Sequence, residues 1–254
     1  MTILCYHSVQ PEWASPLAVE PADFAEQCAW LHRRRRVLPL DEAVRLLDRS
    51  GRLPRGAAAL TFDDGFAELH RHALPVLARY RFPWTVFLVA QTLAPGGQPV
   101  DWVDTPPPPP QRLSTLTADQ VLEMQELGVD FQSHSYAHLD LTELSFAECV
   151  TDLRTSRELL SDLLGRSVSS LAFPRGRHSE QVRRAAERAG YHYAFSLPER
   201  HEPIERFAIP RVGIYRGNSL RAVRIKSARP YLPLRTHRRY EQLAAVARRV
   251  PARG

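Results

Sequence analysis

Residues of the types found in metal-binding and acid–base sites stand at four separate places in this sequence. They are the adjacent pair Asp63 and Asp64, the pair His134 and His138, the single His7, and Pro174 with Arg175. Neutral imidazoles and one carboxylate, with a position left for water, form the ligand set of a catalytic zinc centre. Where two carboxylates are adjacent, one can bind the metal while the other accepts a proton. This combination of residue types points to metal-assisted hydrolysis.

Each of these places also has a simpler explanation. Two aspartates before a glycine, here Gly65, often mark only a turn in which their side chains bond the local backbone. Two histidines four residues apart are more often solvated than metal-bound, and a lone histidine near an N-terminus usually has no special function. The case for a site therefore depends on whether the fold brings the four places together.

Short apolar, β-branched runs alternate with amphipathic stretches along most of the chain, which predicts βα units around a parallel sheet. The predicted strands are Ile3–Tyr6, Val37–Pro39, Ala58–Phe62, Trp84–Val89, Val129–Gln132, Leu171–Phe173, Tyr193–Leu197 and Ile209–Ile214. Each of the four places lies directly after one of these strands. Because all strands of a barrel end at the same face, the four places would meet in one site.

The number and length of these units match a (β/α) barrel, complete or with one unit missing, and a doubly wound open sheet is the alternative. No G-x-G-x-x-G or P-loop motif follows a predicted strand, which argues against the usual nucleotide-binding role of an open sheet. Capping boxes at Thr117–Gln120 and Ser145–Glu148 mark the starts of two helices. The proline run 106–110 indicates a surface insertion.

Length and charge favour one domain with a basic tail. The chain has 254 residues and a net charge of +6, and residues 228–254 hold seven arginines against one glutamate, so the tail accounts for the whole excess. We predict a barrel over residues 1–226 and a basic tail over residues 227–254, with a further helix near Tyr240–Arg249. The neutral body argues against nucleic-acid binding, whereas the tail could contact an anionic surface.

The three cysteines, Cys5, Cys28 and Cys149, form no C-x-x-C pair. They are interpreted as small buried residues rather than as disulfides or metal ligands. The N-terminus has no basic segment followed by an apolar stretch, and no apolar run approaches about 18 residues. We therefore expect a cytoplasmic protein without a membrane span.

Three motifs together resemble those of the polysaccharide deacetylases, the carbohydrate esterase family 4, which includes chitooligosaccharide and peptidoglycan deacetylases. They are Thr61-Phe-Asp-Asp-Gly65, His134-Ser-Tyr-Ala-His138 and Phe173-Pro-Arg-Gly176, and the likeness extends over about residues 1–215. The resemblance implies an α/β fold, a distorted (β/α)7 TIM-like barrel in a single domain. It also implies a divalent metal, expected to be zinc, and removal of N-acetyl groups from amino sugars.

Carried over residue by residue, the resemblance makes Asp64, His134 and His138 the metal ligands and Asp63 the general base. A metal in such a site lowers the pKa of water from 15.7 toward about 7 and polarises the amide carbonyl. The metal and a nearby backbone N–H would then stabilise the oxyanion.

The leaving amine also needs a proton, and here the sequence departs from the common pattern. Most members of the family supply this proton from a Leu-x-His motif near the C-terminus, whereas Leu4-Cys-Tyr-His7 stands at the other end of this chain. The opening Tyr6-His-Ser-Val9 resembles a circularly permuted subgroup of exopolysaccharide deacetylases. We expect His7 to be the general acid, with His201 as the alternative and a structural role for His7 as the third interpretation.

A second departure concerns the arginine that keeps the base ionised. Arg175 directly follows Pro174, whereas many relatives carry an arginine before the proline. Either Arg175 or Arg211 could pair with Asp63 and lower its pKa, and either could instead bind substrate hydroxyls.

The expected reaction is hydrolysis of an N-acetyl group on an amino sugar in a glycan, a lipid-linked precursor or a small glycoside. Hydrolysis of another amide or of a formamide is the alternative within the same chemistry. A non-catalytic carbohydrate-binding barrel is the alternative from another class. It is disfavoured because the base and all three candidate metal ligands are present.

Overall fold

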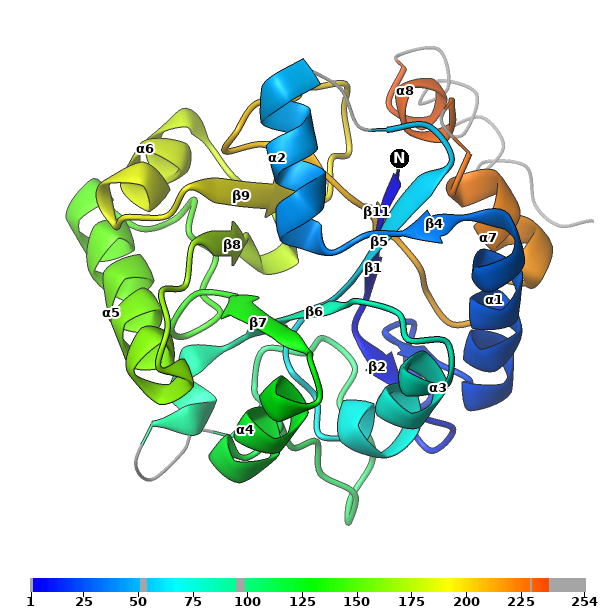
Figure 1. Ribbon diagram of the computed structural model, residues 1–254. Helices are drawn as coiled ribbons and strands as arrows, with labels where there is room; N and C mark the ends of the chain where they lie inside the picture. The colour runs from blue at the N-terminus through cyan, green and yellow to red at the C-terminus, as the bar shows by residue number, and fades with distance from the viewer. Residues whose placement is uncertain (1, 51–53, 95–98, 229, 238–254) are drawn as a thin grey trace, which may run out of the picture.

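The computed structural model describes residues 2–50, 54–94, 99–228 and 230–237. In Figure 1 the strands occupy the centre of the molecule and the helices surround them. The strands are β1 (Thr2–Tyr6), β2 (Ser8–Val9), β3 (Ala18–Val19), β4 (Arg36–Val37), β5 (Ala57–Phe62), β6 (Thr85–Leu88), β7 (Asp130–Ser133), β8 (Ser170–Ala172), β9 (Tyr193–Ser196), β10 (Ile209–Pro210) and β11 (Val212–Gly213). All eight predicted strands are confirmed, and the last is divided into β10 and β11.

The main sheet is parallel and nearly closes into a barrel. Its hydrogen-bonded path runs β10-β9-β8-β7-β6-β5-β1-β11, with β4 paired to the beginning of β5. β10 and β11 belong to one segment, residues 209–213, whose first part pairs with β9 and whose last part pairs with β1. The two ends of the path therefore meet at Arg211. With that segment counted once, the ring has the seven positions of a distorted (β/α)7 barrel, and the open-sheet alternative is wrong.

The helices are α1 (Pro21–Arg34), α2 (Leu40–Ser50), η1 (Leu69–Ala73), α3 (Leu74–Arg79), η2 (Ala90–Leu93), α4 (Ala118–Glu126), α5 (Phe146–Leu164), η3 (Pro174–Gly176), α6 (Glu180–Arg188), α7 (Leu220–Lys226) and α8 (Tyr231–Arg235). Both predicted capping boxes are confirmed. The hydroxyl of Thr117 accepts the N–H of Gln120 at the start of α4, and Ser145 accepts the N–H of Glu148 at the start of α5.

Two apolar layers hold the barrel together. Inside it, residues from successive strands, including Ile3, Ala59 and Phe87, pack with Leu40 and Val44 of α2. Helix α2 therefore covers the end of the barrel where the strands begin (Figure 1). A larger apolar layer lies between the strands and the outer helices. The predicted site residues follow the strands and so lie at the opposite end of the barrel.

The beginning of the tail packs on the barrel. The Thr2 hydroxyl donates to the carbonyl oxygen of Ser227, and Tyr231 of α8 packs against the main core. The predicted domain boundary after Lys226 stays a prediction, and the predicted helix near Tyr240–Arg249 lies outside the described residues. Among the helices of the described ranges, none combines the length and the apolar character that a membrane span requires.

Candidate active site

The two aspartates follow β5 at the end of the barrel opposite α2. The N–H of Asp63 donates to the carbonyl oxygen of Tyr6 at 3.0 Å, which ties the end of β5 to β1. Asp64 then adopts φ of 68°, a left-handed conformation that costs a residue other than glycine about 1–3 kcal/mol. Asp63 is 1% exposed and Asp64 is 2% exposed. An ordinary surface turn would leave these side chains in water, so their burial argues for a site.

The histidine loop follows β7 and is held in place by its neighbours. His134 Nδ1 lies 2.8 Å from the carbonyl oxygen of Ala172, so Nδ1 carries the proton and Nε2 remains an acceptor. His138 has φ of 54°, again in the left-handed region. The Asp152 carboxylate on α5 accepts the N–H groups of the two residues that precede His138, at 3.0 and 3.1 Å. Asp152, which sequence reasoning missed, therefore fixes the loop that presents both imidazoles.

Asp64, His134 and His138 form one compact cluster whose ligand atoms all lie within 4.8 Å of one another. Asp64 Oδ1 is 3.3 Å from His138 Nε2 and 3.7 Å from His134 Nε2. Burial, with the charge of Asp63, raises the pKa of Asp64 to about 8, and burial lowers the pKa of His138 to about 2. Neutral imidazoles around a buried carboxylate that has no arginine or lysine partner among the described residues suit a divalent cation.

Asp63 has a different partner, Arg211. The two Nη atoms of Arg211 lie 2.6 and 2.7 Å from the two carboxylate oxygens of Asp63, and both residues are buried. Burial acts to raise the pKa of Asp63, but the Arg211 charge opposes it, and the pKa lies well below its ordinary value. Asp63 is therefore ionised and able to act as a base. Arg175, the other candidate, pairs with Asp104 at 3.1 Å instead.

Replacing Arg211 by methionine is expected to lower the free energy of unfolding by about 3–5 kcal/mol, because Asp63 is left buried without its partner. Urea unfolding followed by circular dichroism measures this loss. The double variant that also carries Asp63→Asn should recover much of the stability, since a neutral amide needs no counterion. The control Arg45→Met breaks a surface pair with Asp41 and is expected to cost less than about 1 kcal/mol. Equal losses in Arg211→Met and the control would contradict the prediction.

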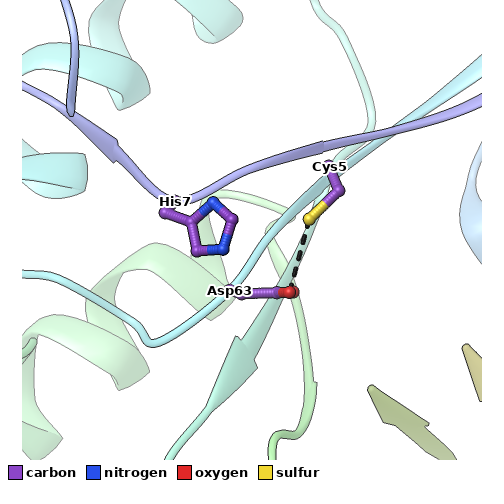
Figure 2. A group of neighbouring side chains, drawn as sticks. All are labelled: Cys5, His7 and Asp63. Atoms are coloured by element: carbon purple, nitrogen blue, oxygen red, sulfur yellow. Dashed lines mark hydrogen bonds between the residues drawn. The ribbon is translucent and has the colours of Figure 1, made fainter. Parts of the chain in front are cut away.

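His7 and Cys5 stand beside Asp63, as Figure 2 shows. Cys5 is buried as expected, but its Sγ also lies 3.3 Å from Asp63 Oδ2 and donates a hydrogen bond to it. The three side chains bring their ligand atoms within 4.8 Å of one another. However, the Arg211 guanidinium already occupies both oxygens of Asp63, so this second cluster does not suit a cation. His7 Nδ1 is buried without a hydrogen-bond partner, and burial lowers the pKa of His7 to about 4.

A cavity of about 220 Å³ joins these groups, because His7, both aspartates and both imidazoles of the histidine loop line it. Arg175 lines it as well, whereas the buried Pro174 in η3 does not. His201 is exposed in the segment after β9 and is not among the lining residues. Six predicted site residues therefore converge on the cavity, Arg211 supports one of them, and His201 lies apart.

Trp102 and Asp104 also line the cavity, although sequence reasoning missed both. Trp102 Nε1 donates to Asp64 Oδ1 at 3.0 Å, and its ring stacks on His138 with 5.2 Å between centroids. Arg175 binds the Asp104 carboxylate and the carbonyl oxygen of Trp102, which fastens this loop at the cavity. The one sequence feature that could have drawn attention to these two residues is their position just before the proline run 106–110.

The fold and the site define a parallel α/β barrel with an Asp-His-His cluster and a second, ion-paired aspartate where its strands end. The sequence profile of the polysaccharide deacetylase family matches residues 50–194. The chain therefore belongs to the polysaccharide deacetylase family, as its motifs indicated.

Curated relatives and solved structures resemble this chain over most of its length. YxkH of Bacillus subtilis (strain 168) is 26% identical over 192 residues, which cover 75% of this chain and 62% of that protein. The poly-beta-1,6-N-acetyl-D-glucosamine N-deacetylase of Staphylococcus epidermidis is 25% identical over 207 residues, 77% of this chain and 67% of that protein. The chain thus spans only about two thirds of the length of these relatives.

Among solved structures, the Streptococcus pyogenes deacetylase PplD in complex with acetate has a TM-score of 0.76 at 23% identity, over 90% of this chain and 98% of that one. IcaB from Ammonifex degensii has a TM-score of 0.71 at 22% identity, over 89% of this chain and 97% of that one. These likenesses show the fold. Membership of the circularly permuted subgroup stays a prediction.

Proposed function

We propose that this protein is a metal-dependent deacetylase that hydrolyses the N-acetyl group of an amino sugar. The observation that carries the proposal is one cavity in which a buried, ionised aspartate, Asp63, stands beside an Asp-His-His cluster. The family membership supports the reaction class, and the named substrate of the Staphylococcus epidermidis relative supports an N-acetylglucosamine-type substrate. The proposal keeps the predicted cytoplasmic setting and a soluble or lipid-linked substrate.

In this proposal Asp64, His134 and His138 hold the metal, for which zinc is the expected choice because imidazole and carboxylate ligands suit it. When bound, a zinc ion supplies Lewis-acid polarisation of the amide carbonyl and a lowered pKa for the attacking water. Asp63 accepts one proton of that water as its oxygen bonds to the acetyl carbon. The bond between that carbon and the nitrogen then breaks and acetate leaves. The amine nitrogen takes a proton from His7, whose ring is neutral at rest and passes on the proton that Asp63 accepted from water.

The test combines metal analysis with product analysis. Protein stripped with a chelator and reloaded with zinc is assayed for bound zinc and for acetate released from β-1,6-linked N-acetylglucosamine oligomers. We expect near-stoichiometric zinc and acetate release that disappears on stripping and returns on reloading. A protein that binds no divalent metal, or whose acetate release does not depend on metal, would refute the proposal.

His7→Ala is expected to lower kcat by about 10²–10⁴-fold while the bound zinc and the stability stay close to wild type. The ring Nδ1 has no hydrogen-bond partner, so its removal breaks no bond that this atom makes. His201→Ala is the matched control and is expected to retain full turnover, since His201 does not line the cavity. If His7→Ala keeps wild-type kcat, or if His201→Ala loses it, the assignment of the acid is wrong.

A further inference from the structure

A second cavity of about 170 Å³ adjoins the active site and has no assigned role. It shares Arg175, Leu197 and Tyr215 with the active-site cavity, so the two are neighbours along one wall. Its far side is formed by α7 and α8, through Lys226 and Arg235. The volume is far above the roughly 10–15 Å³ that one water needs, so a group of several atoms fits.

The lining of this cavity is strongly cationic. It includes three arginines and a lysine, against Glu199 as the one acidic lining residue of the described chain. Arg211 is paired with Asp63 and Arg175 with Asp104. Lys226 and Arg235 form no salt bridge with any carboxylate of the described residues. Two positive charges therefore face one small space without a fixed counterion.

The cavity wall also holds a hydrogen-bond donor without an acceptor. Lys226 Nζ donates to the carbonyl oxygen of Gly213 at 2.8 Å and to Asn218 Oδ1 at 2.7 Å, which leaves one of its three N–H groups. Burial, with the charge of Arg235, lowers the pKa of Lys226 to about 8. An anion bound between the two cations would offset the repulsion between their charges.

Tyr215 connects the two cavities. Its ring lies under the Lys226 ammonium, 5.2 Å from Nζ to the ring centroid, and stacks with His7 at 6.2 Å between centroids. A group bound beside Lys226 is therefore separated from His7 by a single aromatic ring. The second cavity therefore lies directly beside the proposed acid of the active site.

We infer that the second cavity binds a phosphate group carried by the substrate, so that the preferred substrate is a phosphorylated N-acetyl amino sugar. The inference rests on the proposed deacetylase function. Phosphate fits better than a neutral hydroxyl because ammonium and guanidinium groups form their strongest hydrogen bonds with charged oxygens. A phosphate also carries enough negative charge to balance Lys226 and Arg235 together.

The first experiment measures binding of inorganic phosphate to the zinc-loaded full chain by isothermal titration calorimetry. Lys226→Gln and Arg235→Gln are each expected to weaken binding by about 10-fold or more, since a charged hydrogen bond contributes about 1.5–3 kcal/mol. Arg224→Gln removes a charge from the same helix outside the cavity and should bind like wild type. Equal affinity in all four proteins, or no phosphate binding at all, overturns the inference, and equal affinity would place the phosphate on the zinc.

The second experiment compares substrates. N-acetylglucosamine 1-phosphate should show a KM about 10-fold below that of the methyl glycoside. Lys226→Gln should abolish this difference, whereas Arg224→Gln should keep it. The KM of a diphosphate diester of the same sugar is compared with that of the 1-phosphate. The lower of the two KM values shows whether a nucleotide- or lipid-linked sugar or a free sugar phosphate is preferred. A KM that is equal for charged and uncharged substrates overturns the inference. Phosphate binding that depends on Lys226, without acetate release from any substrate, supports the cavity and refutes the deacetylase.

Discussion

Replacing Asp63 by asparagine is expected to lower kcat by about 10²–10⁴-fold while the protein keeps its zinc. Asparagine has nearly the same shape, but its amide cannot accept a proton from water. Asp63 is not among the candidate metal ligands of the Asp-His-His cluster, so the metal should remain. Zinc content by plasma mass spectrometry and acetate release by a coupled assay measure the two effects on the same preparation.

The matched control is Asp130→Asn, which also neutralises an arginine-paired carboxylate, here a partly exposed one. Asp130 begins β7 and so lies at the other end of the barrel from the site. This variant is expected to lose stability but to keep kcat and zinc. If Asp63→Asn loses its zinc, the roles of Asp63 and Asp64 have been exchanged; if it keeps full kcat, Asp63 is not the base.

The core of the site could be predicted because its residues directly follow strands. Apolar, β-branched runs identify the strands, and parallel strands in a barrel bring their C-terminal ends together whatever lies between them in sequence. Asp63 after β5 and His134 after β7 are therefore close although 71 residues separate them. The choice between Arg175 and Arg211 needed the structure, because the sequence placed Arg211 inside the predicted strand Ile209–Ile214 and not at its end. Arg211 lies where the barrel closes between β10 and β11, and there it reaches Asp63.

The remaining contacts come from segments without periodicity or from single side chains on helices. The loop that carries Trp102 has no pattern that fixes its path, and its contact with Asp64 depends on the pairing of Arg175 with Asp104 across the chain. Asp152 lies on α5 beside a stripe of apolar residues, where one polar residue gives no sign that it accepts two loop N–H groups. Such contacts depend on three-dimensional distances that a pattern of residue types does not encode.

Backbone strain at the site was also invisible in the sequence. Asp64, His138 and Arg175 all have positive φ, between 54° and 68°, although none is a glycine. Each such residue costs about 1–3 kcal/mol, which the surrounding packing and hydrogen bonds must offset. Because two of the three are candidate metal ligands, the strained conformations coincide with the atoms that must converge. This coincidence supports a functional role for the Asp-His-His cluster.

Asp64→Ala is expected to remove bound zinc and to reduce acetate release to background. The substitution deletes the oxygen that lies 3.3 Å from His138 Nε2 and leaves two imidazoles as the only remaining members of the cluster. It also removes a buried carboxyl group whose ionisation is opposed by burial and by the charge of Asp63. The metal-free variant should therefore unfold at no lower urea concentration than metal-free wild type, although the hydrogen bond from Trp102 is lost.

Loss of zinc without a change in urea unfolding distinguishes loss of the metal site from loss of the fold. His178→Ala serves as the control, because His178 is a largely buried histidine outside the cluster that pairs with Glu202, and its variant should keep zinc and acetate release. Reloading Asp64→Ala with excess zinc should restore neither property, since a missing ligand cannot be replaced by mass action at ordinary concentrations. Acetate release that survives in zinc-free Asp64→Ala would show that the chemistry does not depend on the Asp-His-His cluster, and the proposed function would fall with it.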